Sequence, residues 1–125
     1  MKKDPDCPFC HPDREIILKG ACCYAIYDMF PVNRGHILVI TNRHVGDYFE
    51  LEQEEIEDLW ETIRKVKDLL NEKYHPDGFN VGFNVGEAAG QTIDHVHIHV
   101  IPRYEGDMED PTGGVRHVIP VRGKY

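Results

Sequence analysis

The chain has 125 residues, enough for one domain with a single core, and its 41% hydrophobic content excludes an intrinsically disordered protein. Its 14 basic and 22 acidic residues give a formal net charge of −8, which argues against a nucleic-acid polymer as partner but not against a small phosphorylated substrate. No apolar run reaches transmembrane length, so we expect no membrane partner. Because no apolar stretch follows Lys2 and Lys3, we also expect no signal peptide and a cytoplasmic protein.

Four cysteines occur as two pairs, and the first pair, Cys7 and Cys10, has CxxC spacing. Without a secretory signal, metal binding or free thiols explain such cysteines better than a disulfide framework does. A CxxC pair supplies half of a tetrahedral zinc site, so two further ligands must come from elsewhere, with histidines the obvious candidates. Idle thiols are the alternative. We assign the second pair, Cys22 and Cys23, a structural role.

Predicted strands and one helix follow in chain order. Strands are expected at residues 15–18, 22–28 and 36–41, where β-forming residues are grouped between turn residues. From about 51 to 74, apolar residues recur at i, i+3, i+4 and i+7, which predicts an amphipathic helix. Another strand is expected at 78–85. This order predicts an α+β domain with an antiparallel sheet of about five strands and one long helix. The open edges of such a sheet favour pairing with a second copy.

The last predicted strand carries three histidines at alternate positions. They are His95, His97 and His99, with aliphatic residues between them. Because side chains alternate along a strand, this pattern predicts three imidazoles on one face, about 7 Å apart, and the aliphatic residues in the core. Imidazole titrates near neutrality and binds metals and phosphates. A single strand histidine is usually idle, but three in register directly after Gly-Gln-Thr at 90–92 are poorly explained by chance.

This segment resembles the signature of the histidine triad (HIT) family, in which three histidines alternate with apolar residues after Gly-Gln-Ser/Thr. The resemblance extends from Cys7 to about Tyr104, and the Gly-Gly-Val-Arg-x-Val-Ile-Pro tail is similar to one microbial branch. It implies a single HIT-like domain over residues 1–125 and a homodimer built around the long helix and a sheet edge. It also implies that the tail, about 105–125, packs near the active site or the dimer interface.

Family members similar to this chain hydrolyse or transfer nucleotidyl groups. By this resemblance His97 attacks the α-phosphorus, and water then releases a nucleoside monophosphate from the nucleotidyl-histidine. His99, Gln91 and Thr92 are expected to donate hydrogen bonds to phosphate or to the leaving group. His36 is similar to a further family histidine that supports the triad's hydrogen bonds, although an ordinary histidine at a strand end would look the same.

The resemblance also assigns nucleotide binding to six residues. They are Asp28 at the ribose hydroxyls, Asn84 at ribose or phosphate, Gly90 in the loop before the triad, and Ile26, Met29 and Leu38 around the base. A turn aspartate is the alternative reading of Asp28, and the three apolar residues are equally explicable as core. A preference for adenosine therefore rests on analogy.

In branches with an N-terminal CxxC, zinc is bound by the cysteines, a histidine after the hairpin and the first triad histidine. The matching residues are Cys7, Cys10, His44 and His95. Four protein ligands leave no open position, so the implied zinc is structural and ties the N-terminus to the triad strand. His11 is a rival ligand, but its adjacency to Cys10 strains tetrahedral geometry.

The sequence favours a nucleotidyl hydrolase acting at the α-phosphorus of adenosine nucleotides, such as dinucleoside polyphosphates or nucleoside phosphoramidates. One alternative is a nucleotidyltransferase or phosphorylase that uses phosphate or a sugar phosphate as acceptor. Another is a nucleotide-binding module with negligible turnover, which the presence of a nucleophile at His97 disfavours.

Overall fold

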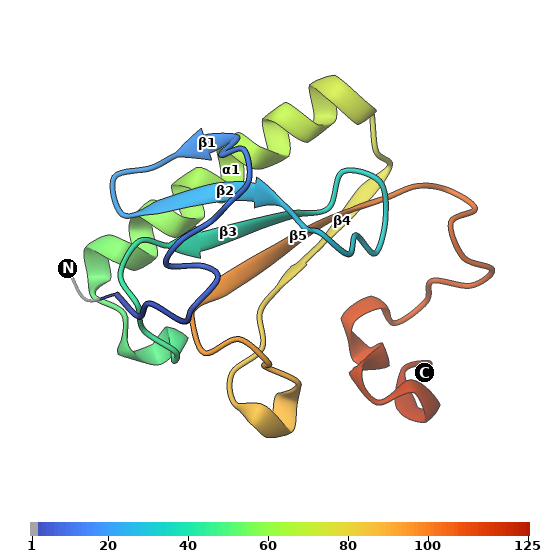
Figure 1. The fold of residues 1–125 in the computed structure, drawn as a ribbon. Helices are drawn as coiled ribbons and strands as arrows, with labels where there is room; N and C mark the ends of the chain where they lie inside the picture. Colours follow the sequence, from blue (N-terminus) through green and yellow to red (C-terminus); the bar gives the residue numbers. More distant parts are fainter. Residues whose placement is uncertain (1–2) are drawn as a thin grey trace.

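The computed structural model describes residues 3–125 (Figure 1). Residues 1 and 2 lie outside the described residues. They belong to the N-terminal segment in which we expected no signal peptide. The strands are β1 (Leu18–Lys19), β2 (Cys23–Tyr27), β3 (Ile37–Thr41), β4 (Gly78–Gly82) and β5 (His97–Arg103), and the long helix is α1 (Gln53–Tyr74). Short 3-10 helices are η1 (Tyr48–Glu50), η2 (Glu87–Ala89), η3 (Gly114–Val118) and η4 (Pro120–Arg122).

The five strands form one antiparallel sheet in the order β1-β2-β3-β5-β4. This confirms the predicted α+β class with one long helix and a five-stranded sheet. Strand β5 lies between β3 and β4, so the histidine strand is an interior strand of the sheet. Its pairing with β3 places His99 opposite Leu38 and His97 opposite Ile40.

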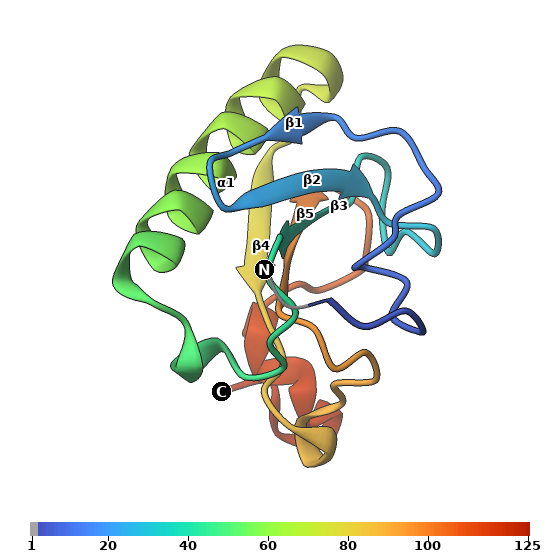
Figure 2. The same ribbon diagram turned by 60° about the vertical axis from the view of Figure 1, so that its left-hand side comes forward.

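The two faces of the sheet have different coverings (Figures 1 and 2). Helix α1 packs across one face, where its apolar side Leu59, Val66 and Leu70 meets the aliphatic residues of β5, Ile98 and Val100. The N-terminal segment lies over part of the other face. There a smaller core cluster joins three strands to that segment, and its buried members are Cys7, Phe9, Cys10, Tyr24, Ile26, Leu38 and Ile40.

Three strand predictions differ from the structure by more than one residue at an end. Strand β1 is Leu18–Lys19 instead of 15–18, because much of the chain before it packs on the sheet's open face. Strand β4 stops at Gly82 instead of residue 85. Strand β5 begins at His97, two residues after the first histidine of the triad. The backbone N–H of Val96 donates to the carbonyl of Val45. The alternation continues through this stretch, since Val96 packs in the same core cluster as Ile98 and Val100, and Phe9 contacts the rings of both His95 and His97.

Trp60 on α1 is 40% exposed, so it is not part of the core. Its indole N–H donates to the hydroxyl of Tyr48. Within residues 3–125, no helix combines the length and the apolar character needed to cross a bilayer.

Candidate active site and metal site

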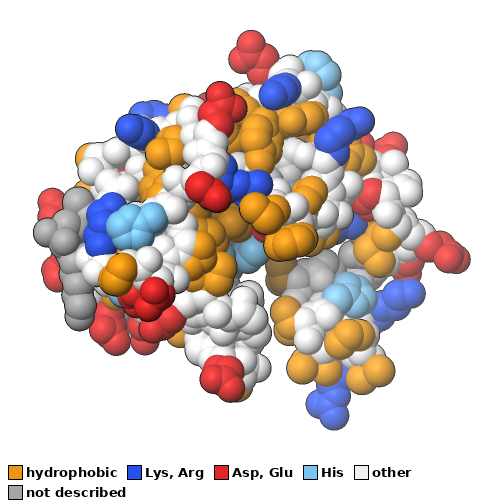
Figure 3. Space-filling model, viewed as in Figure 1, with side chains coloured by type: hydrophobic (Ala, Val, Ile, Leu, Met, Phe, Trp, Pro, Cys, Tyr) orange, Lys and Arg blue, Asp and Glu red, His pale blue; other side chains and the backbone are white. Residues whose placement is uncertain are grey.

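The open face of the sheet carries a cavity of about 520 Å³, which we call the triad cavity. Figure 3 shows this face, with hydrophobic side chains around a hollow in which a histidine is visible. The cavity is lined by Phe9, Asp28, Phe30, Val32, His36, Leu38, Asn84, Gly90, Thr92, Ile93, His97, His99 and Ile101. The structure thus brings together most of the residues that the sequence assigned to catalysis and nucleotide binding.

A hydrogen bond to the main chain determines which ring nitrogen of neutral His97 carries the proton. Its Nδ1 lies 2.7 Å from the carbonyl oxygen of His95. Since a carbonyl oxygen can only accept, Nδ1 carries the proton, and Nε2 of the neutral ring keeps its lone pair. Phe9 contacts the ring edge-on, with centroids 5.0 Å apart. In its neutral form the ring is held in place with an unprotonated nitrogen in the cavity, and these are the properties of a nucleophile.

A second chain of hydrogen bonds orients His99. The backbone N–H of Val32 donates to Nδ1 of His36 at 3.0 Å, so the neutral His36 carries its proton on Nε2. That Nε2 lies 2.9 Å from Nδ1 of His99 and donates to it. In neutral His99 the proton is then on Nε2. His36, the residue whose role the sequence left open, therefore makes His99 a donor.

Burial keeps this pair of rings neutral. It lowers the pKa of His99 to about 4, with repulsion from His97 and His36 adding to the effect and Asp28 opposing it. Burial also lowers the pKa of His36 against the attraction of Asp28, whose carboxylate lies 3.4 Å from His36 Nε2. Neutral rings are what the hydrogen-bond chain requires, since a doubly protonated His36 has no lone pair for Val32.

A neighbouring apolar cavity of about 260 Å³ shares Asp28, Leu38 and Phe9 with the triad cavity. All three predicted base-contacting residues, Ile26, Met29 and Leu38, line it. Of these, Ile26 and Leu38 are also buried in the smaller core cluster, so the core reading is confirmed for them and base contact stays a prediction. Asp28 lines both cavities and lies at their boundary.

Gln91 is the one predicted catalytic residue that does not line the triad cavity. Its side-chain amide donates to the carbonyls of Gly46 and Ile93 and accepts from the N–H of Gly86. These bonds fix the loop that carries Gly90 and Thr92. Gly86 and Ile93 belong to the same loop as Gln91, but no local sequence pattern predicts the bond to Gly46, because that residue lies 45 positions away.

Sequence reasoning also missed several aromatic and aliphatic lining residues, chiefly Phe9, Phe30 and Ile93. Phe9 contacts the rings of both His95 and His97. The sequence did offer a signal for Phe9, because it lies between Cys7 and Cys10. A residue between two predicted metal ligands is held close to the site that they form.

A second cluster brings together the four predicted zinc ligands. One ligand atom from each of Cys7, Cys10, His44 and His95 lies within 4.8 Å of the others. Nδ1 of His95 is 3.3 Å from Cys7 Sγ, 3.6 Å from Cys10 Sγ and 3.3 Å from His44 Nδ1, and Cys10 Sγ is 3.2 Å from His44 Nδ1. Tetrahedral zinc with bonds of about 2.3 Å to sulfur and 2.0–2.1 Å to nitrogen separates its ligand atoms by about 3.3–3.8 Å.

The chemistry of His95 fits a metal as well. Its Nε2 lies 2.7 Å from the carbonyl oxygen of Thr41 and must donate to it, so Nδ1 holds a lone pair directed at the other three ligands. The ring is fully buried, and burial lowers its pKa. The residues present therefore fit zinc.

The pattern of the HIT domain family matches residues 11–106. The chain belongs to the HIT family. It is 36% identical over 96 residues to a bis(5'-adenosyl)-triphosphatase of Dictyostelium discoideum, which covers 77% of this chain and 64% of that protein. It is 35% identical over 108 residues to an AP-4-A phosphorylase of Mycobacterium tuberculosis, covering 84% of this chain and 55% of that protein. The chain thus spans less than two thirds of the length of either relative.

A solved structure adds the metal to this comparison. The zinc-bound histidine triad family protein of Mycobacterium smegmatis superposes with a TM-score of 0.75 at 32% identity, covering 84% of this chain and 80% of that one. The similarity supports the family fold, and it shows that a protein with this fold has been solved with zinc bound.

We expect the His99 ring to stay neutral down to about pH 4, because burial and two neighbouring imidazoles disfavour its charged form. Histidine-resolved NMR titration measures this directly. Since the folded-state pKa is lowered, the linked stability is complete above about pH 6.5 and is lost as the pH falls toward 4. The His99→Asn variant should therefore lose less melting temperature than the wild type between pH 7 and 4.5. Titration of His99 near 6.5 would contradict this.

Proposed function

We propose that the chain hydrolyses nucleotides at the α-phosphorus through a nucleotidyl-histidine at His97. The observation that carries the proposal is the hydrogen bond from His97 Nδ1 to the His95 carbonyl, which leaves Nε2 unprotonated beside the triad cavity. The names of the relatives support the substrate class, since one is a bis(5'-adenosyl)-triphosphatase.

In the first step the Nε2–phosphorus bond forms and the bond from phosphorus to the leaving group breaks. His99 donates its Nε2–H to an oxygen of the reacting phosphate or of the leaving group. The hydroxyl of Thr92 and the amide of Asn84 line the same cavity and supply further neutral donors. In the second step water attacks phosphorus, the phosphorus–nitrogen bond breaks, and the nucleoside monophosphate leaves.

Base and ribose have positions that match this chemistry. The apolar cavity around Ile26, Met29 and Leu38 takes the base, and Asp28 accepts hydrogen bonds from the ribose hydroxyls. Gly90 has φ +94 and borders the triad cavity, so the main chain there approaches the phosphate without a side chain between them. Gln91 acts by holding this loop.

Removing the nucleophile should abolish turnover and spare binding. We expect His97→Ala to keep less than about a hundredth of the wild-type kcat on diadenosine triphosphate, while calorimetry still detects AMP binding. His75→Asn is the matched control, because His75 is the left-handed C-cap of α1 and asparagine tolerates that conformation. Substantial turnover by His97→Ala would place the chemistry elsewhere.

A phosphorylase is the second candidate, and it is favoured by the name of the Mycobacterium tuberculosis relative. In that reaction inorganic phosphate replaces water as acceptor of the nucleotidyl group. Product analysis by mass spectrometry with and without added phosphate separates the two, because hydrolysis of diadenosine triphosphate yields AMP and ADP, whereas phosphorolysis yields two ADP and no AMP.

We further propose that Cys7, Cys10, His44 and His95 bind one structural zinc per chain. Bound zinc would supply folding free energy by tying the N-terminal segment to the start of the triad strand. Metal analysis of protein purified without chelators should find about one zinc per chain. Cys7→Ser and His95→Asn should lose both the metal and several degrees of melting temperature.

His97→Asn is the control for the zinc assignment, because its ring lies outside the cluster. It should keep the metal and the melting temperature and lose activity alone. Full zinc retention by His95→Asn would remove His95 from the ligand set and return it to the triad as a phosphate donor.

We also propose that the protein is a homodimer built around α1 and the free edge of β4. β4 is a terminal strand of the sheet, and Trp60 on α1 and Val81 on β4 are both exposed. Large apolar side chains of the C-terminal segment are exposed as well: Val115, Val118, Ile119, Val121 and Tyr125.

The cytoplasmic location of the protein stays a prediction.

Light scattering at micromolar protein should give twice the 14.4 kDa mass of one chain. Trp60→Glu should shift the mass toward one chain, because it places a charge on the proposed interface. Glu61→Ala, a neighbouring exposed position, is the control. A wild-type mass of one chain would overturn the dimer.

A further inference from the structure

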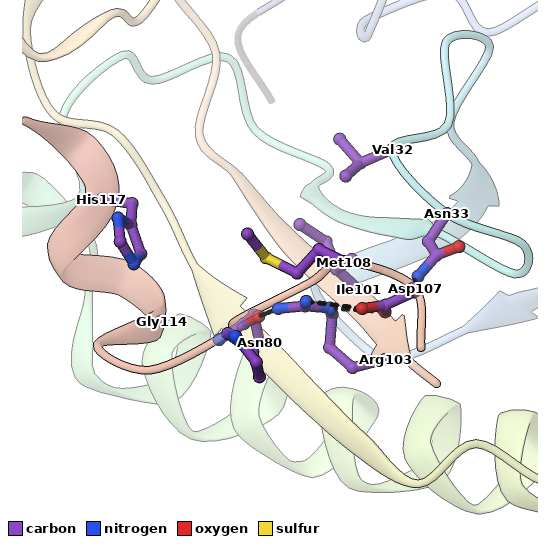
Figure 4. Close-up of a pocket in the computed structure, with 10 residues that line it drawn as sticks. Val32, Asn33, Asn80, Ile101, Arg103, Asp107, Met108, Gly114 and His117 are labelled. Carbon is purple, nitrogen blue, oxygen red and sulfur yellow. Dashed lines mark hydrogen bonds and ion pairs between the residues drawn. The ribbon is translucent and has the colours of Figure 1, made fainter. Parts of the chain in front are cut away.

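A third cavity, of about 310 Å³, adjoins the triad cavity and has no part in the steps described above. We call it the tail cavity, because the segment after β5 forms one side of it (Figure 4). Its lining residues are Val32, Asn33, Asn80, Ile101, Arg103, Asp107, Met108, Pro111, Gly114 and His117. Two of them, Val32 and Ile101, also line the triad cavity, so the two spaces share a wall.

The position of the tail cavity follows from the alternation of β5. His97, His99, Ile101 and Arg103 face the open side of the sheet, with successive side chains about 7 Å apart. The base cavity around Ile26 shares none of its lining residues with the tail cavity. The triad cavity borders both. A ligand with its reacting phosphorus at His97 therefore has two further cavities within reach. The base cavity suits the nucleoside that becomes bonded to His97, and the tail cavity lies on the other side, beyond His99.

The charges of the tail cavity disfavour an anion. Among the described residues that line it, Arg103 is the one guanidinium or ammonium group, and Asp107 neutralises it through two hydrogen bonds of 2.8 Å. A third bond, of 2.7 Å, joins Arg103 to the amide oxygen of Asn80. With its donors used in this way, Arg103 has little to offer a phosphate or a sugar phosphate.

The remaining walls suit an uncharged, flat group. Val32, Ile101, Met108 and Pro111 are apolar, and Figure 4 shows the His117 ring and Val32 on opposite sides of the cavity, with Met108 between them. The ring of His117 is tethered, since its Nε2 donates to the carbonyl of Thr112 at 2.7 Å. Apolar and aromatic walls with few polar groups are typical of small-molecule sites, and about 300 Å³ is the lower end of their size range.

We propose that the tail cavity binds the second nucleoside of a dinucleoside polyphosphate, so that the C-terminal segment recognises the leaving group. This inference rests on the proposed function. When the bond from the α-phosphorus to its bridging oxygen breaks, that oxygen leaves with the remaining phosphates and the nucleoside at their far end. The phosphates span the wall formed by Val32 and Ile101, and the nucleoside stays in the tail cavity until release.

Two substrates that share the adenylyl half test the proposal. Diadenosine triphosphate carries a nucleoside in its leaving group, whereas adenosine 5'-phosphoramidate releases only ammonia. We expect Met108→Trp, which fills the cavity, and His117→Ala, which removes one wall, to lower the ratio of kcat/KM for the first substrate over the second by about tenfold. Val121→Ala, a 91% exposed position in the same segment, should leave the ratio unchanged. An unchanged ratio in both cavity variants overturns the proposal.

A binding measurement separates this inference from the hydrolase proposal. Calorimetry on the wild type compares AMP with a methylene-bridged diadenosine triphosphate analogue, which is not hydrolysed, so the result does not depend on turnover. The analogue should bind about tenfold more tightly than AMP, and both cavity variants should lose that difference. Equal binding of AMP and the analogue by the wild type would refute the tail cavity as a nucleoside site, whatever the chain hydrolyses.

Discussion

The hydrogen bond from His97 Nδ1 to the carbonyl oxygen of His95 connects the two chemical centres of this molecule. The ring of His95 belongs to the cysteine–histidine cluster, and its Nε2 is anchored to Thr41 at the end of β3. The main chain of the same residue fixes the tautomer of His97. Because both contacts use His95, the cluster sets the position of the acceptor on which the proposed nucleophile depends. A structural metal site would thus contribute to catalysis by orienting a carbonyl group, without contacting substrate.

The apolar surroundings of the triad cavity explain why His36 and His99 stay neutral. Leu38 lies opposite His99, and Ile40 lies opposite His97, so each imidazole has an aliphatic neighbour on the open face. The same face carries Phe9 and Ile26. These side chains exclude water, and desolvation penalises the charged ring, which lowers the pKa of both His36 and His99. Packing on this face therefore selects the protonation states that the hydrogen-bond chain from Val32 to His99 needs.

Periodicity predicted the sheet, the helix and the alternating histidines of the triad, because alternation along a strand is a local property. The other predicted residues of the triad cavity came from the family resemblance. It did not predict where β5 starts. At that end the backbone N–H of Val96 donates to Val45, a contact between distant segments. The same limit applies to Gln91, whose partners lie at Gly46, Gly86 and Ile93. The tail cavity was beyond prediction, since its walls come from the β2–β3 loop, two strands and the tail.

The side chains that line the triad cavity explain how a protein with a net charge of −8 could act on a nucleotide. Among the described residues lining the triad cavity there is no lysine or arginine, and Asp28 contributes a negative charge. In the proposed reaction, phosphate is therefore bound by neutral donors such as His99 Nε2–H and the Thr92 hydroxyl. Neutral donors favour the transition state by their fixed orientation, without the strong ground-state attraction of a full positive charge. When hydrolysis converts a phosphodiester-like α-phosphate into a monoester with more negative charge, no cation retains it, and Asp28 repels it. The absence of a cation in this cavity therefore favours product release.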